Sequence, residues 1–179
     1  MQNTNIQWTA HTLNFWWGCT KVSRACKHCY AETVAKVFGK RLFGTVPQWG
    51  AGKPRFERLE AARKEALKIQ RQAVKSGTRP RVFVNSMSDW LDDEVPVEWL
   101  AFLLKTLHLC PNVDFQLLTK RPENWYRRVS LVEGEMAESW IDCIDMPERG
   151  DIPENLWIGC TVEEQAAADA RIPHHAFPQ

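Results

Sequence analysis

Four short runs of apolar residues, separated by longer helical stretches, constrain the fold of this chain more than any other feature. The runs lie at residues 12–17, 81–86, 113–119 and 155–161. Segments such as VFV, FQLL and LWIG are apolar at successive positions, which is typical of strands covered on both faces. Strand and helix alternate along the chain, and this alternation predicts parallel β/α units in an α/β protein.

Helices are expected between and after these strands, because apolar residues recur there at spacings of three and four. The predicted helices cover residues 27–44, 56–77, a segment with Pro96 in its first turn, 121–129 and 162–171. Residues 131–153 are acidic and predict an irregular insertion.

The length of 179 residues suits a single domain spanning residues 1–179. Four strands cannot close a barrel of about eight. The sheet is therefore expected to be open, or to be the front part of a larger domain. The second interpretation is favoured, since the last residues contain no helix cap and no strand.

Composition excludes several classes of protein. Hydrophobic residues make up 44% of the chain, which is enough for a core and excludes a disordered or collagen-like protein. No stretch approaches the ~18 apolar residues of a membrane span, and the N-terminus lacks the pattern of a signal peptide. A cytoplasmic location without a membrane partner is therefore expected.

Charge is balanced overall but not along the chain. Residues 53–81 contain ten basic and three acidic residues. Such a basic segment can attract phosphate groups, and a solvated helix face is the alternative interpretation.

Three of the six cysteines lie close together, in the pattern Cys19-x6-Cys26-x2-Cys29. Thiols in a reducing compartment are poor disulfide candidates, whereas thiolates suit iron–sulfur clusters, zinc and copper(I). The pattern lies on a loop before a helix, whose N-terminus favours the thiolate form. We therefore expect Cys19, Cys26 and Cys29 to bind a metal centre. A zinc site completed by His11 or His28, and thiols without a ligand, remain the alternatives.

Three thiolates, rather than four, would leave one iron of a 4Fe–4S cluster open. S-adenosylmethionine (SAM) can bind such an iron through its amino and carboxylate groups. SAM and iron–sulfur centres together give access to radical chemistry.

Several motifs resemble those of an uncharacterised family of phage and prophage proteins. They are WWGCTKVSRACKHCYAE, VFVNSMSDW, FQLLTKRP and LWIGCTVE, and the similarity extends from Ile6 to about Pro173. Members carry the three-cysteine motif, are distantly similar to radical-SAM enzymes and usually continue beyond this point, which implies a C-terminally truncated chain. The resemblance implies an incomplete TIM-like barrel of radical-SAM type, with the cluster in the loop after the first strand.

One feature departs from the broader radical-SAM pattern C-x3-C-x2-C. Six residues separate Cys19 from Cys26, and His28 stands where an aromatic residue is usual. Because loop length can vary without changing the number of ligands, a cluster is still expected.

Polar residues follow the second, third and fourth predicted strands, at the end of a parallel sheet where ligands gather. They are Asn85, Ser86, Ser88 and Asp89, then Thr119, Lys120 and Arg121, then Thr161 and Glu163. The radical-SAM resemblance implies that this rim contacts SAM. Asn85, Ser86 and Asp89 are candidates for its amine and ribose. Lys120 and Arg121 are candidates for a carboxylate or phosphate. Helix capping by Ser88 and Asp89 is the structural alternative.

Together these features predict a radical-SAM-like enzyme whose catalytic residues are not identified. A flavodoxin- or ferredoxin-like protein is the expected electron donor. Nucleic acid or a nucleotide is the expected substrate, from the phage resemblance and the basic helix. The alternatives are a zinc-stabilised nucleic-acid-interaction module without catalysis, and an inactive truncated remnant.

Overall fold

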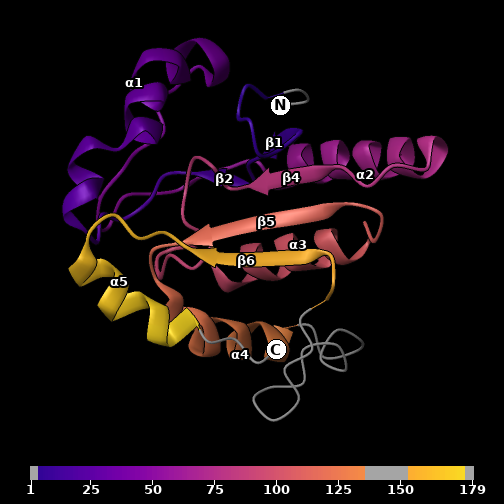
Figure 1. Cartoon of the computed structure of the whole chain (residues 1–179). Helices are drawn as coiled ribbons and strands as arrows, with labels where there is room; N and C mark the ends of the chain where they lie inside the picture. Colours follow the sequence, from indigo (N-terminus) through magenta and orange to yellow (C-terminus); the bar gives the residue numbers. More distant parts are fainter. Residues whose placement is uncertain (1–3, 136–152, 176–179) are drawn as a thin grey trace.

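A four-stranded parallel sheet forms the centre of the computed structural model, which describes residues 4–135 and 153–175 (Figure 1). Its strands are β1 (His11–Leu13), β4 (Arg81–Val84), β5 (Asp114–Thr119) and β6 (Leu156–Cys160), and they lie side by side in that order. All three neighbouring pairs are parallel. The predicted α/β class with parallel β/α units is therefore confirmed.

Helices connect and follow the strands as the sequence pattern predicts. They are α1 (Tyr30–Phe43), α2 (Leu59–Ser76), α3 (Val97–His108), α4 (Trp125–Glu135) and α5 (Gln165–Arg171). Short 3-10 helices occur at Arg24–His28, Pro122–Asn124 and Ile172–His175. None of the helices in the described ranges is long and apolar enough to cross a membrane.

The prediction of a single strand at residues 12–17 is wrong, because the structure has two short strands there. Only β1 joins the parallel sheet, whereas β2 (Trp16–Trp17) pairs antiparallel with β3 (Phe56–Glu57). The chain leaves the sheet after Leu13, because polar groups of Asn14 and Phe15 form hydrogen bonds with the turn after β4 and not with a neighbouring strand. The Asn14 side chain accepts from the Met87 N–H at 2.8 Å, and the Phe15 N–H donates to the Asn85 side chain at 2.9 Å.

The predicted irregular insertion at residues 131–153 is wrong for its first five residues. Helix α4 continues through Glu135, so residues 131–135 are helical. Residues 136–152 of the predicted insertion lie outside the described part of the chain.

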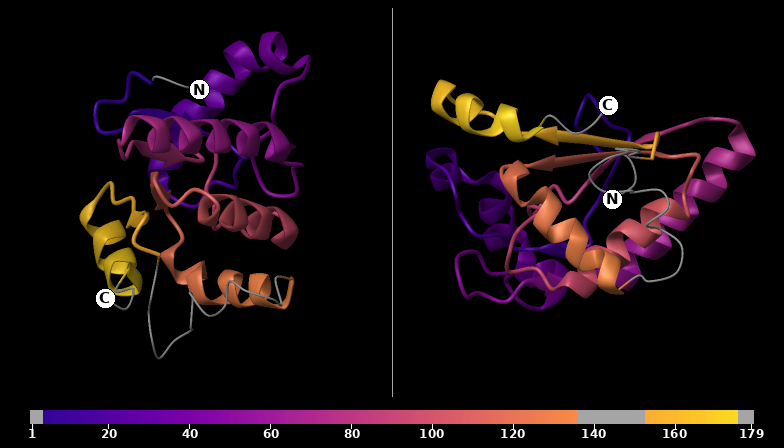
Figure 2. Two further views of the ribbon diagram at one scale, coloured as in Figure 1. Left: turned by 90° about the vertical axis from the view of Figure 1, so that its right-hand side faces the viewer. Right: turned by 90° about the horizontal axis from the view of Figure 1, so that it is seen from below.

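The core lies on one face of the sheet, between the strands and helices α2, α3 and α4 (Figure 2). Along β5, Phe115, Leu117 and Thr119 are buried on this face, and Gln116 and Leu118 alternate with them on the other. The expectation that both faces are covered is therefore wrong for part of the described sheet.

Trp157 of β6 shows this most clearly, because 48% of it is exposed on the second face. Trp8 covers part of that face, because it packs on Phe83 of β4 with the ring centroids 4.8 Å apart. We refer to this second side of the sheet as the open face.

Adjacent leucines on β5 provide a test of this asymmetry. Leu117→Ala should lower the free energy of unfolding by about 2–5 kcal/mol, because the side chain is fully buried against the helices. Leu118→Ala removes the same atoms from the half-buried open face and should cost clearly less. Urea denaturation measures both, and equal losses would contradict a core confined to the helical side.

Candidate functional site

A cavity of about 490 Å³ brings the three clustered cysteines together with polar residues from the ends of the strands. Cys19, Cys26 and Cys29 all line it, and so do Lys120 and Arg121. Apolar side chains complete the lining, among them Ile6, Trp8, Phe83 and Leu118. The cavity therefore combines soft sulfur donors, positive charge and an apolar wall.

The sharp entry of the chain into the cysteine loop depends on Gly18. This residue has a φ of 106°, and a Cβ atom there would lie only 2.5 Å from the Gln48 carbonyl oxygen. Its N–H donates to the Met87 carbonyl at 3.2 Å. Because a larger residue fits neither the backbone conformation nor the space, glycine is required directly before Cys19.

The other two cysteines lie where the loop becomes helical. Cys26 is within the 3-10 helix Arg24–His28, and Cys29 is the residue before α1 begins at Tyr30. The N-terminus of this 14-residue helix presents partial positive charge to Cys29. The Tyr30 hydroxyl donates to the Ser86 carbonyl at 2.6 Å, which ties the start of α1 to the end of β4.

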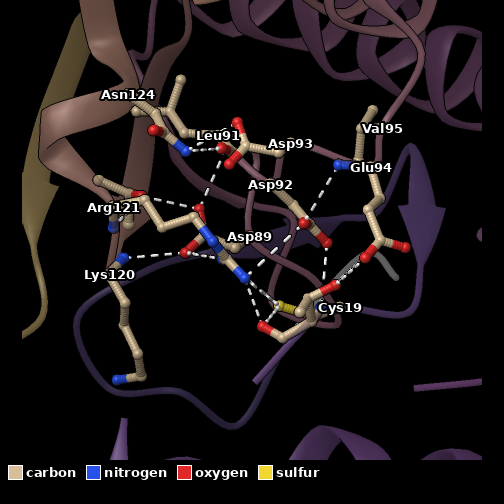
Figure 3. A network of polar contacts seen from close by, with 12 residues as sticks. Cys19, Asp89, Leu91, Asp92, Asp93, Glu94, Val95, Lys120, Arg121 and Asn124 are labelled. Carbon is tan, nitrogen blue, oxygen red and sulfur yellow. Dashed lines mark hydrogen bonds and ion pairs between the residues drawn. The ribbon is translucent and has the colours of Figure 1, made fainter. Parts of the chain in front are cut away.

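A buried network of four charged side chains lies next to Cys19, and Figure 3 shows three of them, Arg121, Asp89 and Asp92. Arg121 contacts Asp89 at 2.9 Å and Asp92 at 3.7 Å. Asp92 also pairs with Arg55 at 2.8 Å, and both of these side chains are only 1% exposed. Two guanidinium groups and two carboxylates therefore neutralise one another where solvent is excluded.

The network holds the first cysteine directly. Arg121 approaches the Cys19 sulfur at 3.7 and 3.8 Å with its two terminal nitrogens, and one of them also donates to the Thr20 carbonyl. Arg55 donates to the Thr20 hydroxyl at 2.6 Å, and the Thr20 N–H donates to Asp92 at 3.1 Å. Cys19 is thus attached to the ends of β4 and β5 through buried charges.

The environments of two of the thiols differ. Burial raises the pKa of Cys19 to about 12, although the positive charge of Arg121 opposes the shift. Burial also disfavours the Cys26 thiolate, but the pKa of Cys26 is lowered overall. The groups that stabilise this thiolate are the Ser23 hydroxyl, 3.4 Å away, backbone hydrogen bonds and the charge of Lys120.

The cavity contains four of the six predicted cofactor-binding residues: Ser86, Asp89, Lys120 and Thr161. Asn85 is not in its lining. It is buried with a φ of 57°, and its side-chain oxygen accepts from Phe15. Glu163 is also outside the lining, and it pairs with Lys120 and with Arg171 at 2.8 Å. Asn85 therefore supports the turn after β4, and Glu163 joins the ends of β5 and β6.

Asp89 reaches the cavity, but its oxygens are already bound. One accepts from the Thr119 hydroxyl at 2.7 Å and from the Leu91 N–H at 3.1 Å. The other accepts from the Lys120 N–H at 2.9 Å and from Arg121. Its contacts position the strand ends, whereas the predicted alternative of helix capping by Asp89 is wrong, because α3 begins at Val97 with Pro96 as its N-cap.

Two residues of the network, Arg55 and Asp92, were not predicted as site residues from the sequence. Arg55 was one of the ten bases of a segment expected to be exposed, yet it is buried. Asp92 lies in the acidic turn DWLDDE, where Asp89 and Asp92 are buried and Asp93 is exposed. The sequence feature that could have indicated Asp92 is the position of this turn, which begins a few residues after the end of a buried strand.

The described residues contain no group of three or more His, Cys, Asp or Glu side chains placed to hold a metal ion. His11 and His28, the alternative zinc ligands, do not line the cavity. The five cysteines in the described ranges form no disulfide.

The stability of the network can be tested with neighbouring aspartates. Asp92→Ala leaves the buried Arg55 with only the partly exposed carboxylate of Glu94, 3.4 Å away, and should lower the free energy of unfolding by up to about 3–5 kcal/mol. Asp93→Ala removes a carboxylate whose side chain is 53% exposed and should cost less than about 1 kcal/mol. Urea denaturation of both variants measures the difference, and similar values would show that burial of the network contributes little.

Thiol reactivity in the metal-free protein should follow the difference in pKa. Since alkylation requires the thiolate, Cys26 should react with iodoacetamide faster than Cys19 at mildly alkaline pH, and Cys19 should stay mostly protonated until the pH nears 12. Tryptic cleavage at Lys21 and Arg24 separates the two cysteines for mass spectrometry. Faster labelling of Cys19 would be inconsistent with its burial beside Arg121.

Comparison with known proteins identifies a family but not an activity. Residues 3–176 match the model of a family described as "Protein of unknown function (DUF5131)". No curated protein and no solved structure matches the chain. The relation to phage proteins and to radical-SAM enzymes stays a prediction. Because the match covers almost the whole sequence, the chain belongs to this uncharacterised family.

Proposed function

We propose that this protein binds a 4Fe–4S cluster through Cys19, Cys26 and Cys29 and is a radical-SAM-like enzyme. The observation that supports the proposal is the shared cavity, in which three cysteines and two cations meet at the carboxyl ends of parallel strands. In β/α barrels, active sites lie at this end of the strands. We further propose that the four described strands are part of an incomplete barrel of radical-SAM type.

The donor set fits a cluster in its chemistry. Soft thiolates are the usual ligands of iron–sulfur clusters. Each thiolate binds a different iron, so the three sulfurs need to surround a cavity and do not need to converge on one ion. A volume of about 490 Å³ is within the ~300–1,000 Å³ that is typical of ligand pockets.

Two cationic side chains in the cavity lining, Arg121 and Lys120, can donate hydrogen bonds to thiolates and inorganic sulfide, while Asp89, Asp92 and Glu163 pair with them from outside the ligand. Arg121 is held by Asp89 and Asp92, so its guanidinium group is fixed beside Cys19. Lys120 contributes charge that favours the Cys26 thiolate. Hydrogen bonds and nearby charge are the means by which a protein adjusts the reduction potential of such a centre.

The polar rim offers hydroxyl groups to a second ligand. Ser86, Ser88 and Thr161 line the cavity together with its apolar residues. When bound, a cluster with three thiolate ligands leaves one iron open to the amino and carboxylate groups of SAM and supplies the electron that cleaves its sulfonium bond. Trp8 and Phe83 would keep water from that region.

The electron donor and the substrate follow from the same proposal. A flavodoxin- or ferredoxin-like protein would reduce the cluster. The resemblance to phage proteins favours nucleic acid or a nucleotide as substrate. Lys64, Lys68 and Arg71 are exposed on α2, where they can attract phosphate groups, although α2 lies on the helical side of the sheet.

Anaerobic reconstitution tests the cluster. The wild type and Cys110→Ala, which changes a buried cysteine outside the cavity, should each bind about four iron and four sulfide per chain. Cys26→Ala should lose most of both, because one of three ligands is missing. Iron and sulfide analysis, with visible absorption that dithionite bleaches, measures the result.

Two outcomes would contradict the proposal. Equal iron content in Cys26→Ala and Cys110→Ala would mean that the iron is not held by the cysteine cavity. A colourless protein with one tightly bound zinc would favour the zinc-stabilised module instead.

A further inference from the structure

The open face of the sheet contains a second pocket, which the proposed cluster site does not use. Its volume is about 360 Å³. It is lined by Trp8, Gln116, Leu118, Trp157, Ile158 and Gly159. It shares Trp8 and Leu118 with the cysteine cavity, so the two pockets adjoin along the open face.

Strand register places an amide between aromatic rings. Gln116 of β5 is aligned with Phe83 on one side and with Trp157 on the other. Trp8 packs on Phe83. Trp8 is 41% exposed and Trp157 is 48% exposed, so both residues offer surface on which a planar ligand can pack.

A glycine keeps the pocket open toward the cysteines. Gly159 is aligned with Leu118 in the next row of the sheet. A Cβ atom at Gly159 would lie 2.8 Å from the Leu118 side chain. Any larger residue would therefore fill the space between Trp157 and the carboxyl end of the strands.

The amide oxygen of Gln116 lacks a hydrogen-bond partner. It is buried, and no donor in the described part of the chain reaches it. An unsatisfied buried acceptor costs about 1–3 kcal/mol. A ligand that donates one hydrogen bond inside the pocket would remove this cost.

We propose that this pocket binds a nucleobase with an exocyclic amine, of which adenine is the best match. Gln pairs with adenine through two hydrogen bonds, accepting from the N6 amine and donating to N7. Exposed aromatic side chains stack on bases. As an assignment of the substrate class the inference rests on the proposed function, whereas binding of the base itself requires no cluster.

The two residues that both pockets share indicate how a bound nucleotide would lie. With the base above Gln116, its sugar can extend past Leu118 toward the cavity that contains Lys120 and Arg121. The phosphate of the nucleotide and a cluster bound by the cysteines would then lie on the same side of the base. The site thus suits a nucleotide better than a free base.

Calorimetry with the metal-free full chain tests the pocket. The wild type should bind AMP, should bind IMP more weakly because IMP has no exocyclic amine, and should not bind ribose 5-phosphate. Trp157→Ala should weaken AMP binding about tenfold or more through lost stacking. Gln116→Leu should remove the preference for AMP over IMP. Tyr126→Ala changes an exposed aromatic residue on α4 and should leave binding unchanged.

Other outcomes overturn the proposal. These are no AMP binding by the wild type, AMP binding that neither pocket variant affects, and equal binding of ribose 5-phosphate. A dimer that dissociates in Trp157→Ala, without AMP binding, would instead identify a second copy of the chain as the occupant.

Two further measurements separate this inference from the proposed function and from cofactor binding. Cys26→Ala should still bind AMP, so loss of the cluster and loss of base binding are distinguishable. S-adenosylhomocysteine carries the same adenine, so it should compete with AMP, but it should bind more weakly than AMP if the base belongs to a nucleotide. Binding of S-adenosylhomocysteine that is tighter than that of AMP, and that Trp157→Ala abolishes, would show that the adenine of the cofactor occupies the pocket and would overturn the substrate assignment.

Discussion

The ion network of Arg121, Asp89, Asp92 and Arg55 is the interaction on which the rest of the site depends. Its members come from three separate parts of the chain, and each is almost fully buried. An unpaired charge in this environment would be costly, so the four side chains fix one another. Because Arg121 and Arg55 also bind Cys19 and Thr20, the same contacts that hold the strand ends together determine where the cysteine loop lies.

The two faces of the sheet have different roles in this arrangement. The helical face supplies stability through a continuous apolar core. The open face has fewer buried groups and contains both the exposed indole of Trp157 and the orphaned oxygen of Gln116. These two features reduce stability, and they lie in the pocket that adjoins the cysteine cavity, where a bound ligand can compensate for them. Functional sites typically depart from the local patterns that stabilise a fold, and interactions elsewhere in the protein compensate for the lost stability.

Sequence patterns predicted the strands and helices well because apolar periodicity reflects burial against the core. The same patterns located Cys19, Cys26, Cys29 and Lys120 at one end of the sheet, since carboxyl ends of parallel strands meet there. They could not separate Asn85 from Ser86, because a left-handed backbone at one residue decides which side chain faces the cavity. Nor could they pair Arg55 with Asp92, because this contact joins positions 37 residues apart through tertiary structure.

Electron paramagnetic resonance of the anaerobically reconstituted and reduced full chain tests the central claim most directly. A cluster held by three cysteines with one open iron should give the signal of a reduced 4Fe–4S centre, and addition of SAM should change that signal. A reduced protein without the signal, or a signal that SAM leaves unchanged, would contradict the account.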